Sequence, residues 1–183
     1  MGMSPEAALK QIEATTIVAG MRGNFPPSVA VQVAKTLFEE GVSVFELMMN
    51  SVEPLAAMRA IKHALGDAVC VGMGTVLDMA QVQPVIDAGA DFVVSPAFQP
   101  EIVRAVQAQN VLMAPGVITP SEAVQAWALG VPLLKLFPIG ALGEEYFRAI
   151  FGPLNHMKFM CNGAMDDQNS AALVKAGAVA VGI

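Results

Sequence analysis

Eight short apolar runs, separated by helix-like stretches, dominate this sequence and restrict the folds that are open to it. The runs are rich in Val and Leu, and they do not alternate apolar with polar residues. Unbroken apolar runs of this length are typical of parallel strands that are buried on both faces. They cover residues 17–21, 42–47, 69–73, 92–94, 111–114, 131–137, 157–161 and 179–183.

The residues between the runs favour helices that connect parallel strands. Thr119 is placed to cap a helix, Pro120 suits the first helical position, and Glu122 completes a capping box. Eight strands joined by helices predict the α/β class and a (β/α)8 TIM barrel, with an extra leading helix over residues 4–15. An open doubly wound sheet is the alternative, but it usually has about six strands, and no G-x-G-x-x-G motif follows the first run.

The chain is expected to form one domain over residues 1–183. Its eighth run ends at Ile183, which leaves no residues for an eighth helix or for a loop after the eighth strand. We therefore expect a barrel that is truncated at strand eight, with the final helix missing from this chain. We expect the natural protein to continue past Ile183 with a loop containing Gly or Ser and a last helix.

Composition narrows the class of protein further. With 55% apolar and 14% charged residues, the chain is not disordered, and its apolar stretches are too short to cross a membrane. A net charge of −6 with no basic patch argues against nucleic acid as a partner. Cys70 and Cys161 lie in apolar runs, as reduced core cysteines of a cytoplasmic protein would. His63 and His156 are isolated, so no metal site is expected.

Three charged residues stand where the chemistry of such a barrel is located, at the carboxyl ends of the strands. Lys135 lies among leucines, where a buried ammonium is costly unless it is paired or neutral, and a neutral amine is a nucleophile toward carbonyls. Glu46 lies between Phe and Leu, needs a partner such as Lys135, and suits proton transfer. Arg22 carries a planar fork that suits a carboxylate.

Each of these residues also has a structural interpretation. Lys135 could extend outward between two helices, and Glu46 and Lys135 could form an ion pair without chemistry. Arg22 could serve a helix end or an interface. Small residues also stand at other strand ends, in Gly74-Thr75, Ser95-Pro96 and Asn162-Gly163-Ala164, where they would let a ligand approach the backbone. A helix that begins after Asn162-Gly163-Ala164 could hold an anion at its N-terminus.

Five segments are distinctive when they are taken together: VFELMMN at 44–50, VGMGTVL at 71–77, VSP at 94–96, APGV at 114–117 and LKLFP at 134–138. They resemble the 2-keto-3-deoxy-6-phosphogluconate/4-hydroxy-2-oxoglutarate aldolase family, which comprises class I aldolases on a (β/α)8 barrel. The resemblance runs in register from about Ile17 to the end of the chain. Met49-Asn50-Ser51 and Arg22-Gly23 are most similar to the 2-keto-3-deoxy-6-phosphogalactonate branch.

The resemblance implies roles for the charged residues. Lys135 matches the lysine that forms a Schiff base with the C2 ketone, and Glu46 matches the glutamate that transfers protons. Thr75 matches a threonine that contacts the pyruvyl carboxylate. Many members carry an arginine at the position of Asn50; its absence here implies that Arg22 takes the carboxylate role.

The resemblance also implies substrate contacts in the neighbouring loops. Pro96 and Phe137 are expected to contact the substrate, and Gly163 and Ala164 are expected to bind its phosphate through their backbone. The family usually has Gly-Gly after strand seven, whereas this chain has Gly163-Ala164 followed by Met165. The loop after strand eight, which is the other half of that phosphate site, is absent from the sequence.

These expectations add up to a class I, metal-independent aldehyde-lyase of carbohydrate metabolism. It would reversibly cleave a 2-keto-3-deoxy-6-phospho sugar acid to pyruvate and glyceraldehyde 3-phosphate, without a metal or organic cofactor. The resemblance implies a homotrimer, and the composition favours the cytoplasm. The alternatives are an aldolase for an unphosphorylated keto acid such as 4-hydroxy-2-oxoglutarate, and a catalytically silent barrel that binds phosphate or serves in assembly.

Overall fold

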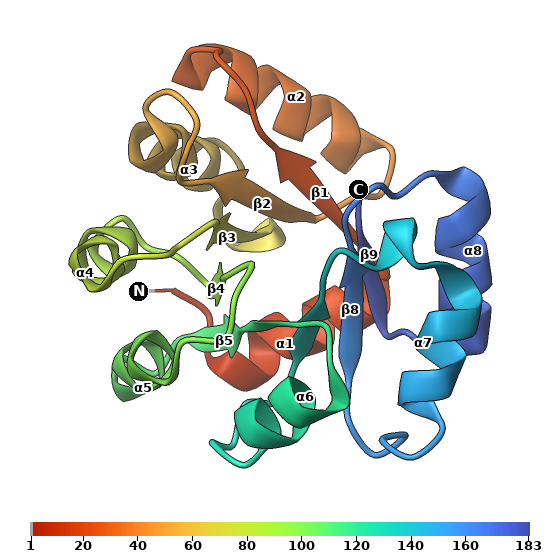
Figure 1. Cartoon of the computed structure of the whole chain (residues 1–183). Helices are drawn as coiled ribbons and strands as arrows, with labels where there is room; N and C mark the ends of the chain where they lie inside the picture. The colour runs from red at the N-terminus through yellow and green to blue at the C-terminus, as the bar shows by residue number, and fades with distance from the viewer. Residues whose placement is uncertain (1) are drawn as a thin grey trace.

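The computed structural model describes residues 2–183 and shows a nearly closed barrel of parallel strands surrounded by helices (Figure 1). The strands are β1 (Ile17–Met21), β2 (Val44–Met48), β3 (Cys70–Gly74), β4 (Phe92–Val94), β5 (Leu112–Ala114), β6 (Gly116–Val117), β7 (Leu134–Leu136), β8 (Phe159–Asn162) and β9 (Ala180–Gly182). The helices are α1 (Pro5–Thr15), α2 (Pro27–Glu39), α3 (Pro54–Leu65), α4 (Met79–Asp87), α5 (Pro100–Ala108), α6 (Pro120–Trp127), α7 (Gly143–Phe151) and α8 (Asp167–Ala176), with short 3-10 helices at Gly66–Ala68 and Ile139–Ala141.

The sheet contains nine strand segments where the sequence predicts eight strands. Its order is β5-β4-β3-β2-β1-β9-β8-β7-β6, and every pairing is parallel. The extra segment arises because β5 and β6 are two parts of one strand, interrupted at Pro115. Proline has no backbone N–H for the ladder, although its carbonyl still accepts from the N–H of Lys135 at 2.9 Å. The chain therefore has the (β/α)8 barrel that the sequence predicts.

The ends of the helices follow local chemistry that is visible in the sequence. The Thr119 hydroxyl accepts from the N–H of Glu122, and the Glu122 carboxylate accepts from the N–H of Thr119 at 2.8 Å, which completes the predicted capping box of α6. Asp78 and Gln81 form the same arrangement at the start of α4. Capping of this kind typically stabilises a helix by about 1 kcal/mol.

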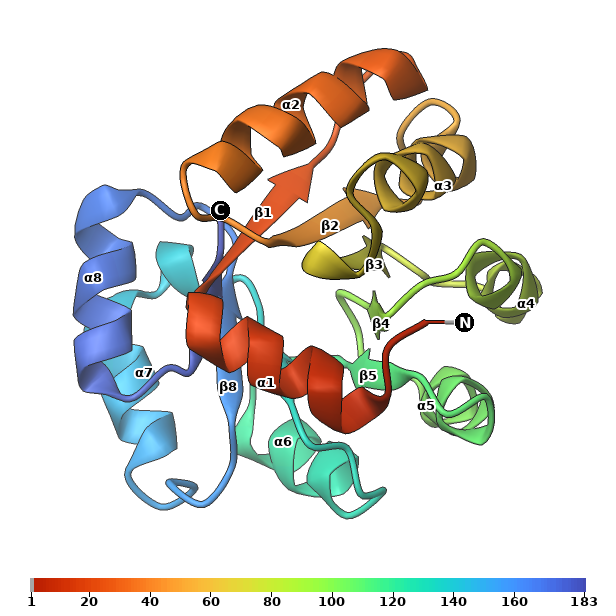
Figure 2. The ribbon, with the colours of Figure 1, turned by 180° about the vertical axis from the view of Figure 1, so that it is seen from behind.

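Helix α1 covers the end of the barrel where the strands begin (Figure 2). Its Ala8 and Ile12 are fully buried and pack into a cluster of side chains that point inward from the strands. The members of this cluster from the strands include Val18, Val44, Cys70, Phe92, Leu112 and Met160. Because this layer fills the barrel from below, the opposite end is the one where a pocket can form.

The outer faces of β1 and β9 border an apolar groove of about 500 Å³, which α8 lines on one side. Ile17, Val174 and Val181 contribute to its walls. Among residues 2–183, β9 is the last element, and α8 is the last helix. No helix in this part of the chain has the length and apolar character needed to cross a membrane.

Candidate active site

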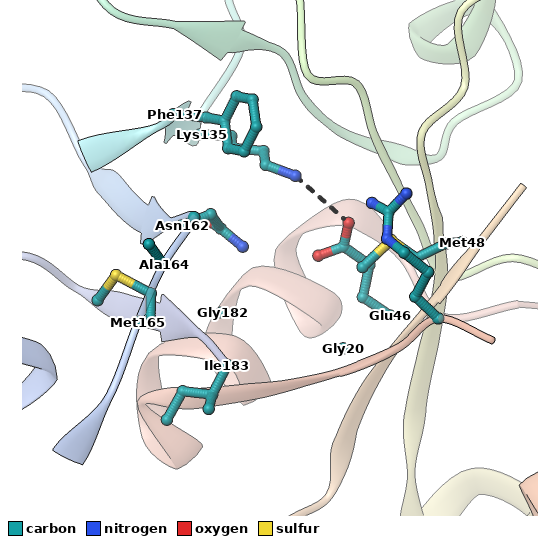
Figure 3. A pocket seen from close by; sticks show the side chains of 12 residues that line it. Gly20, Glu46, Met48, Lys135, Phe137, Asn162, Ala164, Met165, Gly182 and Ile183 are labelled. Atoms are coloured by element: carbon teal, nitrogen blue, oxygen red, sulfur yellow. Dashed lines mark ion pairs between the residues drawn. The ribbon is translucent and has the colours of Figure 1, made fainter. Parts of the chain in front are cut away.

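A pocket of about 340 Å³ opens at the carboxyl ends of β1, β2, β7, β8 and β9 (Figure 3). Along β1, β2 and β7, residues two positions apart face it, because alternate side chains of a strand point to the same side. It is lined by Gly20, Arg22, Glu46, Met48, Lys135, Phe137, Asn162, Gly163, Ala164, Met165, Gly182 and Ile183. The pocket therefore draws its walls from strands that are far apart in the sequence.

Lys135 and Glu46 meet inside this pocket. Lys135 comes from β7 and Glu46 from β2, and the distance from Nζ to Oε1 is 3.6 Å (Figure 3). Their side chains are 6% and 1% exposed, so both point into the barrel and not outward between the helices. The ammonium also lies 5.2 Å from the centre of the Phe137 ring, within the range of a cation–π contact.

The carboxylate of Glu46 is poorly solvated and incompletely partnered. Burial raises the pKa of Glu46 above its ordinary value, while the positive charges of Lys135 and Arg22 pull the pKa partly back. Neither carboxylate oxygen makes a hydrogen bond to another described residue, because 3.6 Å is longer than a hydrogen bond. A carboxyl in this state holds its proton more readily than a solvated carboxyl does, which suits it to proton transfer.

Two glycines make room for the polar groups in the pocket. A Cβ on Gly74 would overlap Oε1 of Glu46 and come within 2.8 Å of the Met48 sulfur. A Cβ on Gly182 would overlap the side-chain amide of Asn162. The position of the Glu46 carboxylate therefore depends on β3 having no side chain where it faces β2.

A second polar cluster lies at the rim, where β1, β2 and β3 end side by side. Arg22 Nη1 donates to Oδ1 of Asn50 at 2.8 Å, and Nη2 donates to Oγ1 of Thr75 at 3.3 Å. Arg22 and Asn50 are exposed, whereas Thr75 is half-buried. Thr75 has a φ of +60°, a left-handed conformation that is rare for a β-branched residue and typically costs about 1–3 kcal/mol.

The loop after β8 presents its backbone to the same pocket. Gly163 and Ala164 both have positive φ values, +92° and +54°, and their N–H groups make no hydrogen bond to another described backbone group. The loop is fixed from two sides, since Gly140 donates to the Gly163 carbonyl and the Asn169 side chain donates to the Ala164 carbonyl, each at 2.9 Å. These free N–H groups are suited to an anion.

Comparison with known proteins identifies the family. The sequence profile of the KDPG and KHG aldolase family matches residues 11–183. The chain belongs to this family. It is 31% identical over 168 residues to a "Probable 2-dehydro-3-deoxy-6-phosphogalactonate aldolase" of Rhizobium meliloti, covering 91% of this chain and 79% of that protein. It is 29% identical to the Escherichia coli "2-dehydro-3-deoxy-6-phosphogalactonate aldolase", covering 91% of this chain and 82% of that protein.

A solved structure supports the same assignment. A KDPG aldolase from Legionella pneumophila, titled with "pyruvate captured at low pH as a covalent carbinolamine intermediate", superposes with a TM-score of 0.88. The two sequences are 26% identical, and the superposition covers 98% of this chain and 86% of the Legionella chain. The family and the barrel inferred from the sequence motifs are therefore confirmed.

Most of the residues that the sequence predicts for the site of this family member line the pocket. Six of the eight do so: Lys135, Glu46, Arg22, Phe137, Gly163 and Ala164. Thr75 contacts Arg22 beside the pocket. Pro96 is not among the lining residues, and a Cβ on Gly116 would overlap the Pro96 carbonyl group.

Sequence reasoning did not place Gly20, Met48, Gly182 or Ile183 in the site. Gly20 and Met48 stand two positions from Arg22 and Glu46, so the alternation of strand side chains was the signal available for finding them. Within residues 2–183, no three His, Cys, Asp or Glu residues are grouped so that they could hold a metal ion.

Proposed function

We propose that this chain is a class I aldolase that cleaves a 2-keto-3-deoxy-6-phospho sugar acid to pyruvate and glyceraldehyde 3-phosphate. The observation that carries the proposal is the buried Lys135–Glu46 pair, 3.6 Å apart at the open end of the barrel. A lysine that is kept away from solvent beside a proton-transferring carboxyl is the arrangement that Schiff-base chemistry needs.

The reaction begins at Lys135, whose ammonium passes a proton to the Glu46 carboxylate. The neutral amine then attacks the C2 carbonyl carbon of the keto acid and forms a carbinolamine, which takes that proton back from Glu46 and loses water to give a protonated imine. The C3–C4 bond then breaks, and its electron pair moves into the imine to give an enamine while the C4 hydroxyl proton leaves. The enamine is protonated at C3, and water releases pyruvate and restores the amine.

Glu46 moves the protons in these steps. It takes the proton from the C4 hydroxyl, directly or through water, and returns protons when the carbinolamine loses water. Its raised pKa and its two oxygens without hydrogen bonds support this assignment, because the carboxyl holds a proton more readily than a solvated one and both oxygens are free to exchange it. The protonated imine is the electron sink, so the mechanism requires no further cofactor.

The other pocket residues hold the ends of the substrate. Arg22 and Thr75 bind the carboxylate that stays with pyruvate, and the N–H groups of Gly163 and Ala164 bind the phosphate. Phe137 packs against Lys135 and bounds the space beside the imine. Pro96 does not line the pocket, so the proposal gives it no contact with the substrate.

A second candidate substrate is an unphosphorylated keto acid such as 4-hydroxy-2-oxoglutarate. The observation that favours it is the acidic start of α8, next to the proposed phosphate loop. The Asp166 carboxylate accepts from the N–H of Asn169 at 2.8 Å and so occupies the helix N-terminus, while Asp167 follows in the first turn. Two carboxylates near this loop disfavour a doubly charged phosphate.

Pyruvate release from three keto acids separates these candidates. The substrates are 2-keto-3-deoxy-6-phosphogluconate, 2-keto-3-deoxy-6-phosphogalactonate and 4-hydroxy-2-oxoglutarate, each at the same concentrations. We expect kcat/KM to favour a phosphorylated substrate by about tenfold or more, as for a charge-assisted contact. Equal or higher kcat/KM for 4-hydroxy-2-oxoglutarate would shift the assignment to the second candidate, and no release from any would indicate a catalytically silent barrel.

We further propose that the chain works as one domain in the cytoplasm and assembles into a homotrimer. Val52, Leu77 and Met79 support assembly, because they are exposed apolar side chains that follow β2 and β3 at the same end of the barrel. The buried free thiols of Cys70 and Cys161 suit a reducing compartment. Light scattering on the purified chain tests the assembly, and a monomeric mass would contradict it.

A further inference from the structure

The rim cluster contains a residue that the proposed reaction has not yet used. Asn50 follows β2 by two residues, is exposed, and accepts the shorter of the two hydrogen bonds from Arg22, at 2.8 Å. Its neutral amide is too short to take over the role of a guanidinium. Its oxygen, however, faces the guanidinium that the proposed function assigns to the substrate carboxylate.

The contact is part of a larger connection between two loops. The N–H of Gly23, next to Arg22, donates to the Ser51 hydroxyl at 3.2 Å, and the N–H of Val52 donates to the Gly23 carbonyl at 3.3 Å. Three hydrogen bonds therefore tie residues 22–23 to residues 50–52. The turn after β2 fixes both the backbone and the side chain of the arginine.

Such fixing matters because Arg22 is exposed. A free arginine at a surface has many side-chain rotamers, and ordering it when a ligand binds lowers affinity. Arg22 uses one N–H toward Asn50 and one toward Thr75, so three of its five N–H groups stay free for a carboxylate. The Thr75 hydroxyl in turn donates to the Met48 sulfur at 3.6 Å. Because Met48 lines the pocket, this contact connects the rim to the pocket wall.

We propose that Asn50 is a positioning residue that orients Arg22 toward the carboxylate of the keto acid, with Ser51 fixing the adjacent backbone. Asn50 itself makes no contact with the substrate. The inference rests on the proposed function, in which Arg22 binds that carboxylate. It predicts that Asn50 acts on carboxylate recognition alone and only while Arg22 is present.

The test compares two ketones that form the same Schiff base. Pyruvate carries the carboxylate and acetone does not, and borohydride reduction traps each on the enzyme for measurement by mass. The variants are Asn50→Ala, Arg22→Ala and the double variant. Asn155→Ala, at an exposed turn at the opposite end of β8, is the matched control.

We expect Asn50→Ala to raise the pyruvate concentration for half-maximal trapping by about three- to tenfold, the range for an ordinary hydrogen bond, because the Arg22–Asn50 contact is exposed and solvent weakens it. Acetone trapping should stay unchanged, and Asn155→Ala should match the parent protein with both ketones. In the Arg22→Ala background, adding Asn50→Ala should cause no further change, because the residue through which it acts is gone.

Each other outcome has a separate meaning. Pyruvate trapping that is unchanged in Asn50→Ala overturns the positioning role. The same holds for an effect of Asn50 that persists without Arg22, or that weakens acetone trapping equally. Failure of the parent protein to trap either ketone would instead refute the proposed function, so the two failures are distinguishable. Ser51→Ala gives a second measurement at the adjacent hydrogen bond, for which we expect a smaller rise with pyruvate alone.

Discussion

The pocket has two polar parts, and they are constructed on opposite principles. The Lys135–Glu46 pair lies inside the barrel on β7 and β2, nearly without exposure and with no hydrogen bond between the two charged groups. The rim cluster of Arg22, Asn50 and Thr75 is exposed or half-buried, and it is held by direct hydrogen bonds between loops. The inner pair is positioned by packing, whereas the rim is positioned by hydrogen bonds.

This difference separates reactivity from recognition. Burial keeps the inner carboxyl out of water and raises its pKa, which makes it reactive. At the rim, solvent screens the charges, so orientation determines how well a carboxylate binds. Changes to the inner pair should therefore act on kcat, and changes at the rim should act on KM.

Lys135→Met tests the inner pair with the largest effect. Because the variant lacks the nucleophile, we expect kcat to fall by at least about 10⁴-fold, as for removal of a covalent catalyst. Lys10→Met, at an exposed lysine of α1, should keep full activity. Steady-state pyruvate release measures both, and activity in Lys135→Met within tenfold of the parent would contradict the assignment.

Glu46→Gln comes next. It preserves the shape of the side chain but cannot transfer a proton, so kcat should fall by about 10²–10⁴-fold with little change in KM. Glu101→Gln, at an exposed position of α5, serves as the matched control. A rise in KM at constant kcat would place Glu46 with the rim and remove the distinction between the two parts.

Arg22→Ala tests the rim. Loss of a charged, bidentate contact should lower kcat/KM by about 10- to 100-fold, and mostly through KM. The comparison is sharpened by assaying this variant beside Glu46→Gln with one substrate. An equal fall of kcat in both variants would show that the rim takes part in the chemical step.

Gly74→Ala disturbs the inner pair without removing it. The added methyl group would overlap Oε1 of Glu46, so the carboxyl must move and kcat should fall by about tenfold or more. Gly152→Ala is the control, because that glycine has helical φ and ψ and its Cβ would meet only the Arg148 carbonyl, at 3.4 Å. Equal kcat in the two variants would show that the carboxyl position is unimportant.

The smallest expected effect concerns stability and pH. Since the pKa of Glu46 is raised from 4.5 in the folded state, its contribution favours folding below pH 4.5 and is lost as pH rises through the raised pKa. Glu46→Gln has no such loss. Its free energy of unfolding, relative to the parent protein, should therefore increase with pH across that window and then level off. Urea unfolding at a series of pH values measures this, and a pH-independent difference would contradict it.

The sequence predicted the inner part of the site better than the rim. A lysine among leucines and a glutamate between Phe and Leu stand out because charges are rare in buried strands. Capping at Thr119 is equally local and was also predicted. These features depend on residue type and strand position alone.

At the rim the sequence predicts Arg22 and Thr75, but it does not predict how these residues contact each other and Asn50. The Arg22–Asn50 contact depends on two loops meeting in space, and Thr75 takes a left-handed backbone that strand periodicity does not encode. Pro96 was expected in the pocket because it follows a strand end, yet the residues that line the pocket do not include it. The break between β5 and β6 occurs at Pro115 because proline has no N–H to donate. It becomes visible only when the hydrogen-bonded pairing of the strands is known.

Borohydride trapping with pyruvate tests the central claim most directly, because it reports the covalent step itself. The chain is incubated with pyruvate and borohydride, digested, and its peptides are weighed. We predict one reduced pyruvyl group per chain, on the peptide that contains Lys135, and none in Lys135→Met. An unmodified Lys135, or an adduct on another lysine, would contradict the assignment of Lys135 as the Schiff-base residue.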